Sequence, residues 1–308
     1  MEFEIDRIFG KYNRFYYMGV AITAIFIYHL FSFGIGYYGI NKHYSILFMG
    51  GYVGVDVFFL LSAYGLCYSL KRGYKSYYLN RFKKLFPLYW LFLSIIFYFF
   101  LNLETKETLY TGILHCTGLS SIKALDSNIE WYIPTLILFY ILFPVLFKIT
   151  HRYSISGGSK EILFVIIMVI GCIALTPLIR GINRLPVFIV GILTYIHKQN
   201  NTTNRLGLIY VIMAIISLLH DKPFYLIPLI LLCISLFCET LPLSNFFSFI
   251  GKYTLEIYLA QVVSTKYLMG SGITSNYLLM VGIVIIDTII LSILFHYFQK
   301  ISSQILFH

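Results

Sequence analysis

The sequence predicts an all-α integral membrane protein that crosses the bilayer many times. Hydrophobic residues make up 59% of the 308 residues, charged residues make up only 12%, and the mean hydropathy is +0.81. A water-soluble domain of this length does not need so much apolar surface, whereas membrane-spanning helices do. The apolar residues occur in long runs joined by short loops, so we expect one transmembrane domain over residues 1–308.

Ten apolar runs reach or approach the length of about 20 residues that a membrane-spanning helix needs. They cover residues 16–36, 48–70, 85–102, 131–150, 161–179, 185–197, 206–220, 223–238, 249–268 and 277–299. The sixth to eighth runs are short. We therefore predict about ten transmembrane helices, and this even number places both termini on the same side of the membrane.

The net charge of +10 follows the predicted topology. With the N-terminus inside, the basic residues concentrate in the inner loops, above all at residues 71–84, while Glu104, Glu107, Asp126 and Glu130 group outside. This asymmetry predicts cytoplasmic termini in a multi-pass protein of the plasma membrane. It also accounts for the positive charge without a nucleic-acid partner. The N-terminus is acidic and polar, unlike a signal peptide, so we expect the first apolar run to be retained.

The five cysteines do not show the spacing of a metal site or of a disulfide framework. We expect most of them to be small apolar packing residues, and we expect no metal ion.

Two ionisable residues lie inside the first two apolar runs. Asp56 lies well within residues 48–70, where a carboxylate costs about 2.5–3.5 kcal/mol unless it faces a polar interior. His29 lies at a comparable depth in the first run. A hydrogen bond between them would orient the imidazole and raise its basicity, as a general base for a hydroxyl requires. Alternatively, each residue satisfies a separate partner and fixes packing.

The first predicted helix carries a stripe that includes this histidine. Met18, Ile22, Ile25 and His29 recur at helical spacing, and Arg14 lies one turn closer to the cytoplasm. A substrate along the stripe could contact the cation and the imidazole. The same spacing is also typical of simple packing.

Basic residues occur at two further places. Arg81, Lys83 and Lys84 form a cytoplasmic cluster beside aromatic residues, which suits either the phosphates of a nucleotide-bearing donor or a topology signal. Arg180 and Arg184 lie in an outer loop, where they could bind a polar or anionic acceptor or form a structural ion pair. Near the centre of the last helix, Asp287 also needs a partner or a wet cavity.

Six short motifs occur in order along nearly the whole chain. They are FIYH at residues 26–29, GVDVFFLLSAY at 54–64, YLNRFKKLFPLYW at 78–90, WYI at 131–133 with Tyr140 and Pro144, FIVG at 188–191 and IGKYTLEIYL at 250–259. Together they resemble the acyltransferase-3 family, ten-helix membrane enzymes that O-acetylate sugars and other cell-surface molecules.

The resemblance implies an acyl-CoA donor, usually acetyl-CoA, that enters from the cytoplasm, and no bound cofactor. It implies that His29 is the family histidine, acting as a base or as a transient acyl carrier, and we predict that Asp56 orients it. It favours donor binding by Arg81, Lys83 and Lys84, to which we add Arg14. We assign Trp131, Arg180 and Arg184 to the acceptor, a saccharide of an envelope polysaccharide or its lipid-linked precursor. Whether the protein forms a homo-oligomer stays open.

Two positions depart from the family pattern. Met18 stands where the family often has arginine, and Gln261 stands where the late motif often ends in histidine. Two other classes of function therefore stay open. One is a transporter or flippase of a lipid-linked sugar, which also keeps polar groups near the midplane. The other is a non-catalytic scaffold of an envelope assembly complex.

Overall fold

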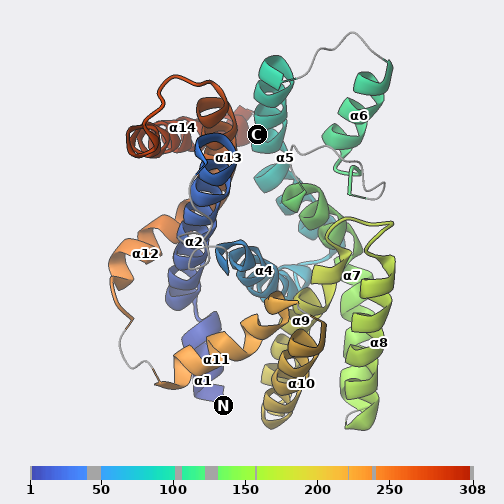
Figure 1. Cartoon of the computed structure of the whole chain (residues 1–308). Coiled ribbons are helices and arrows are strands. Elements are labelled where there is room, and N and C mark those ends of the chain that lie inside the picture. The colour runs from blue at the N-terminus through green and yellow to red at the C-terminus, as the bar shows by residue number, and fades with distance from the viewer. Residues whose placement is uncertain are drawn as a thin grey trace. The chain divides into compact units, whose positions relative to one another are not determined.

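A computed structural model describes residues 2–39, 50–100, 106–121, 131–156, 158–220, 222–237 and 241–305, and the regular elements in these ranges are all helices (Figure 1). The chain forms two compact units, each assembled from separate segments. Unit 1 comprises Met1–Arg14, Asp56–Leu79 and Leu109–Leu243, and unit 2 comprises Phe15–Val55, Asn80–Thr108 and Ser244–His308. The prediction of one transmembrane domain over the whole chain stays a prediction.

The described segments contain α-helices and short 3-10 helices, the latter labelled η. In chain order they are α1 (Glu2–Phe9), α2 (Lys11–Tyr38), η1 (Gly50–Val53), α4 (Gly54–Leu70), α5 (Tyr74–Phe100), α6 (Lys106–Thr117), α7 (Tyr132–Ser156), α8 (Ser159–Leu175), η2 (Ile182–Arg184), α9 (Leu185–Gln199), α10 (Asn204–His220), η3 (Pro223–Leu226), α11 (Ile227–Phe237), α12 (Ser244–Ile250), η4 (Gly251–Tyr253), α13 (Thr254–Gly270) and α14 (Tyr277–Ile305).

Four helical segments of the described chain are long and apolar enough to cross a membrane. They are Asn13–Ile35, Gly50–Leu70, Tyr132–Ile155 and Tyr277–Ile305. They match the first, second, fourth and tenth predicted runs and confirm the all-α membrane class. The other six runs lie mainly on helices that are shorter or less apolar, so the count of ten spans and the orientation of the termini stay predictions.

An aromatic core joins three helices of unit 1. The ring of Phe59 on α4 lies 5.1 Å from that of Phe139 on α7, which lies 5.2 Å from that of Phe188 on α9, all between ring centroids. Gly191 lets α4 and α9 approach closely, because a Cβ at this position would lie 2.4 Å from the Leu60 carbonyl oxygen. These contacts fix the N-terminal halves of α7 and α9, and the part of α4 around Phe59, within one packed unit.

The short helix α1 packs on the same unit, although the sequence there looks polar. Ile5, Ile8 and Phe9 are buried, on the side of α1 that meets α9 and α11. Arg7 donates to the Ser235 carbonyl oxygen at 2.7 Å. Helix α1 is therefore an amphipathic part of unit 1 and not a free tail.

Two prolines interrupt long helices, and in each case a side chain replaces the missing donor. A proline has no N–H, so the carbonyl four residues earlier loses its helical partner. Pro144 in α7 exposes the Tyr140 carbonyl, to which the Tyr77 hydroxyl donates at 2.9 Å. Pro87 in α5 exposes the Lys83 carbonyl, to which the side-chain amide of Gln299 donates at 3.0 Å.

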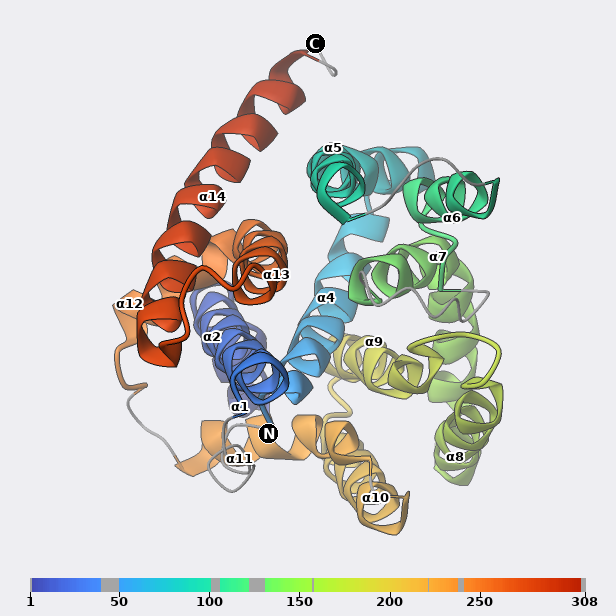
Figure 2. The ribbon, with the colours of Figure 1, turned by 45° about the horizontal axis from the view of Figure 1, so that its top comes forward.

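Unit 2 is organised around α2, α13 and α14, which lie side by side in Figures 1 and 2. Leu30 of α2 packs with Met280 and Val284 of α14, and Leu268 of α13 borders this cluster. The Tyr277 hydroxyl donates to the Leu30 carbonyl oxygen at 3.1 Å.

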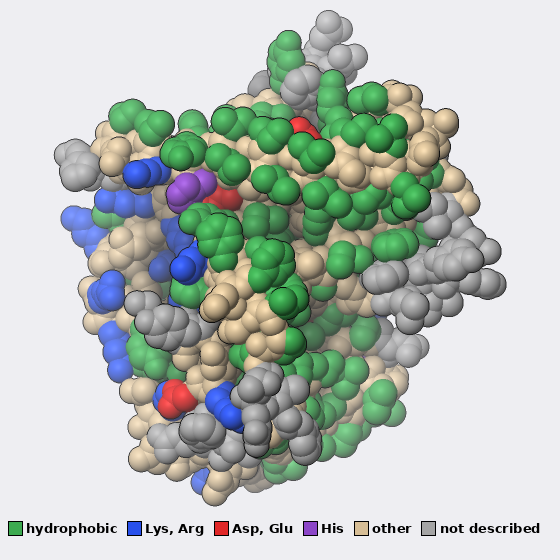
Figure 3. Space-filling view, turned by 90° about the vertical axis from the view of Figure 1, so that its left-hand side faces the viewer, with side chains coloured by type: hydrophobic (Ala, Val, Ile, Leu, Met, Phe, Trp, Pro, Cys, Tyr) green, Lys and Arg blue, Asp and Glu red, His purple; other side chains and the backbone are tan. Residues whose placement is uncertain are grey.

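Apolar side chains cover much of the outer surface. On α14 they include the exposed Leu278, Ile286, Ile293 and Ile301. Figure 3 shows one face on which hydrophobic side chains predominate while Lys and Arg gather toward one side. An apolar surface of this extent is what lipid contact requires.

Candidate active site

A buried ion pair joins two of the predicted site residues in unit 1. Arg184 donates from Nη1 to Oδ2 of Asp56; the arginine is 7% exposed and the aspartate 0%. The guanidinium carbon also lies 3.7 Å from the centre of the Phe224 ring and 5.6 Å from that of Trp131. A carboxylate removed from water needs such a cation, and the aromatic faces stabilise the cation in turn.

Local structure explains how Asp56 comes to this position. It lies in the first turn of α4, where the helix dipole favours a negative charge. The helix begins after η1, so the carboxylate sits at the end of the helix and not in its middle.

The loop that bears the arginines is held against the start of α7. Gly181 has φ of 77°, and a Cβ there would lie 2.6 Å from the hydroxyl oxygen of Thr135, so this position needs glycine. That hydroxyl contacts the Arg180 carbonyl oxygen at 3.1 Å, and the Arg180 N–H donates to the Ser121 carbonyl at 2.9 Å. Arg184 is therefore presented to Asp56 by a fixed backbone.

The sequence left two alternatives for Arg180 and Arg184, which were acceptor binding and a structural ion pair. The structure shows an ion pair for Arg184. Trp131 lies beside it, so three predicted site residues come together in unit 1. Arg180 takes part in the loop through its backbone and is partly exposed. Binding of an acceptor by these residues stays a prediction.

Asp56 keeps one oxygen for another partner. Its Oδ1 is buried and has no hydrogen-bond partner among the described residues. His29 belongs to unit 2, so the predicted hydrogen bond between His29 and Asp56 also stays a prediction.

His29 lies on α2 among aromatic and fully buried apolar residues. Its ring is 5.5 Å from that of Tyr28 and 6.4 Å from that of Phe33, between centroids. Ile22 and Ile25, on the same stripe, are 0% and 1% exposed. The Nδ1 atom of His29 is buried and has no hydrogen-bond partner in the described part of the chain. An imidazole nitrogen in this state is available to a bound molecule.

The basic residues of α5 occupy one turn of the helix within unit 2. Arg81 and Lys83 are partly exposed and Lys84 is exposed. Gln299 of α14 donates to the carbonyl oxygens of both Lys83 and Lys84, at 3.0 and 3.1 Å. The cluster is thus held in place at the helix interruption caused by Pro87. A fixed group of cations at a helix surface can bind phosphate groups.

Arg14 belongs to unit 1, whereas Arg81, Lys83 and Lys84 belong to unit 2. A Cβ at Gly65 of α4 would lie 3.0 Å from Nη1 of Arg14, so the guanidinium packs against that helix. The contact predicted between Arg14 and the donor stays a prediction.

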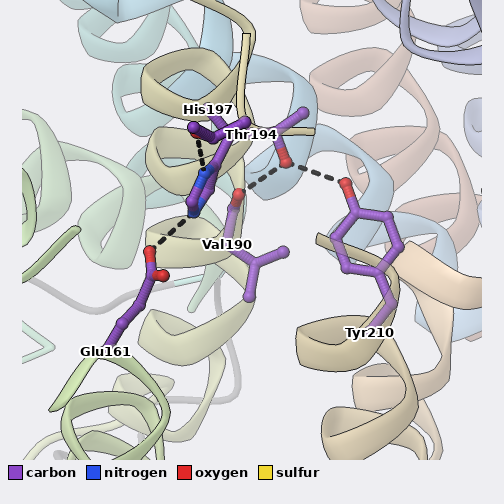
Figure 4. A network of polar contacts seen from close by, with 6 residues as sticks. Glu161, Val190, Thr194, His197 and Tyr210 are labelled. Carbon is purple, nitrogen blue, oxygen red and sulfur yellow. Dashed lines mark hydrogen bonds and ion pairs between the residues drawn. The ribbon is translucent and has the colours of Figure 1, made fainter. Parts of the chain in front are cut away.

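Sequence reasoning missed a buried network in unit 1, which Figure 4 shows. His197 of α9 bonds through Nε2 to Glu161 of α8 and through Nδ1 to Thr202, both at 2.7 Å. One turn earlier, the Thr194 hydroxyl shares a 2.8 Å hydrogen bond with that of Tyr210 on α10. The sequence contains a pattern that could have predicted the pair of Glu161 and His197. Glu161 begins one apolar run and His197 ends another, so the two residues share a membrane depth if α8 and α9 are antiparallel.

The structure also supplies a partner that the sequence could not name. Asp287 of α14 accepts a hydrogen bond from the Ser264 hydroxyl of α13 at 2.7 Å. This contact lies between the two most extensively paired helices of unit 2.

These helices and buried ionisable groups define an integral membrane protein with polar sites inside its helical units, the class of protein in which such groups serve function. A family model described as an acyltransferase domain matches residues 19–297, and the chain therefore belongs to the acyltransferase-3 family. The match includes His29, Asp56, Arg184 and the basic turn of α5, whereas Arg14 precedes it. No curated protein and no solved structure matches the chain.

Proposed function

We propose that the protein transfers an acetyl group from acetyl-CoA to a hydroxyl of a sugar in a cell-surface or exported polysaccharide. The observation that supports this most is the family match over residues 19–297 together with a buried imidazole nitrogen, without a hydrogen-bond partner among the described residues, on a helix long and apolar enough to span a membrane. Acyl transfer to a hydroxyl needs a base or a nucleophile, and histidine supplies either near neutral pH.

In the proposed reaction His29 acts at the thioester. As a base it takes the proton of the acceptor hydroxyl while the oxygen attacks the thioester carbonyl; the C–S bond breaks, and CoA leaves as a thiolate that is then protonated. As a carrier, its nitrogen attacks first, and the acetyl group passes from the ring to the acceptor oxygen. Both routes give one ester and one free CoA thiol.

Charged groups in unit 2 suit the donor, and charged groups in unit 1 suit the acceptor. The turn with Arg81, Lys83 and Lys84 offers cations for the phosphates of CoA at the predicted cytoplasmic side. Trp131 and Arg180, near the Asp56–Arg184 pair, offer an aromatic face and a cation to a saccharide at the predicted outer side.

Purified protein in lipid nanodiscs tests the proposal. It is supplied with acetyl-CoA labelled in the acetyl group and with the polysaccharide and lipid fractions of the source cell. We expect release of free CoA thiol and label that mild alkali removes from the saccharide, as it does from an O-ester. Movement of a lipid-linked sugar with no thiol release would instead indicate a flippase, and donor binding without turnover would indicate a scaffold.

A further inference from the structure

The side chain of Gln261 on α13 is enclosed but unsatisfied. It is 0% exposed, and neither its Nε2 nor its Oε1 has a hydrogen-bond partner among the described residues. Buried side-chain amides are nearly always hydrogen-bonded, and one that is not indicates a partner supplied from elsewhere.

The packing of α13 on α2 fixes the level of this amide in unit 2. At one end a Cβ at Gly251 would lie 1.8 Å from the Phe15 carbonyl oxygen, and at the other end Leu268 packs in the cluster of Leu30. The two helices therefore run parallel. Counted from the Gly251 end, Gln261 is level with Ile25, and counted from the Leu268 end it is level with Thr23, so it lies about 6–9 Å before His29 along the helix axis.

One contact shows what else lies beside this part of α13. Ser264, three residues after Gln261 and therefore on a neighbouring part of the same side of α13, bonds to Asp287 of α14 at 2.7 Å. Gln261 shares its side with Leu268, seven residues later, which faces α2.

His29 lies on α2 between two sides of this helix that each pack against another part of unit 2. On one side Phe26, Leu30 and Phe33 pack with α13 and α14. On the other, a Cβ at Gly54 would lie 2.6 Å from the Ala21 carbonyl oxygen. The imidazole Nδ1 and the Gln261 amide are thus two buried polar groups of unit 2 without a hydrogen-bond partner among the described residues, separated by about 6–9 Å along the helix axis.

We propose that the Gln261 carboxamide binds a secondary amide of the pantetheine arm of the acyl donor. A primary amide offers a donor and an acceptor side by side, which matches the C=O and N–H of a secondary amide. In acetyl-CoA the thioester, two methylene groups and the nearer amide follow one another along one extended chain, which can reach from the level of His29 to that of Gln261. With that amide at Gln261, the thioester lies at His29. The inference rests on the proposed acyl-CoA donor.

Donor analogues test this pairing. Binding and transfer are measured for acetyl-CoA and for an analogue in which an ester replaces the amide nearer to sulfur. The variants are Gln261→Met, which keeps the side-chain volume, and Gln261→Asn, which keeps the amide but places it one methylene group closer to the backbone of α13. Gln199→Met, on an exposed glutamine of α9, is the matched control.

We expect the wild type and the control to prefer the amide donor about tenfold, the equivalent of one or two hydrogen bonds. Gln261→Met should lose that preference, through a weaker affinity for acetyl-CoA alone, and Gln261→Asn should lie between. A wild type without the preference, or a Gln261→Met protein that keeps it, overturns the inference while acetyl transfer itself persists. A wild type that neither binds nor consumes acetyl-CoA overturns the proposed function instead.

Discussion

The side-chain amide of Gln299 donates to the carbonyl oxygen of Lys83, the oxygen that Pro87 deprives of its helical donor. One residue near the end of α14 therefore holds the basic turn of α5 in place, 216 positions away in the chain. This contact therefore links the place where Pro87 interrupts the hydrogen bonding of α5 to the site proposed for the donor phosphates.

Replacing Gln299 by leucine should weaken donor binding without changing the chemical step. The Lys83 carbonyl would lose a hydrogen bond worth about 1 kcal/mol, and the cations beside it would lose their fixed position. We expect the KM for acetyl-CoA to rise about fivefold, with kcat within about twofold. Gln304→Leu, on the exposed side of the same helix, is the control. An unchanged KM would remove Gln299 from the donor site.

The cations themselves should contribute to affinity through their charge. Arg81→Gln combined with Lys84→Gln should raise the KM for acetyl-CoA about tenfold or more and reduce its dependence on ionic strength, because phosphate attraction is screened by salt. Lys75→Gln makes the same kind of change at an exposed position of α5 and should have little effect. Equal effects of the two changes would support the topology explanation of the cluster.

Breaking the Asp56–Arg184 pair should destabilise the protein strongly. Either Asp56→Asn or Arg184→Met leaves a buried group without its partner, and we expect each to cost about 3–5 kcal/mol. The double variant should cost less than the sum, because the two residues act on each other. Thermal unfolding in detergent measures these costs. Additive losses would show that the pair is not coupled.

The Glu161–His197 pair gives a structural counterpart to the proposed site. His197→Leu should lower stability by about 3–5 kcal/mol, since it leaves a buried carboxylate without a partner. Acetyl transfer per folded molecule should stay within about twofold of the wild type. Glu161→Leu added to His197→Leu should recover part of the stability. A large loss of activity at full folding would instead place His197 in the reaction.

The helical class and the main spanning helices could be predicted from the sequence, because runs such as residues 131–150 and 277–299 exceed the length that a soluble core helix needs. Asp56 and His29 could be singled out because charge is costly at membrane depth. An ion pair of the loop with Arg180 and Arg184 could be predicted only as one of two alternatives. Its partner Asp56 could not be named, since separation in sequence gives no distance.

Other features depend on contacts that sequence patterns do not contain. The role of Gln299 requires knowing that α14 passes the carbonyl freed by Pro87. Ser264 is one of several hydroxyls that could have met Asp287. Helix α1 looks like a polar terminus because its apolar side consists of only a few residues, including Ile5 and Ile8, which become buried against α9 and α11.

The most direct test of the proposed reaction is the rate of acetyl transfer by His29→Ala at saturating acetyl-CoA, with donor binding measured on the same sample. The exposed His220→Ala variant on α10 is the control. We predict that His29→Ala folds and binds acetyl-CoA within about threefold of the wild type but transfers acetyl at least about 100-fold more slowly, as loss of a base or nucleophile implies. A folded, donor-binding His29→Ala protein that transfers acetyl at the wild-type rate would contradict the account.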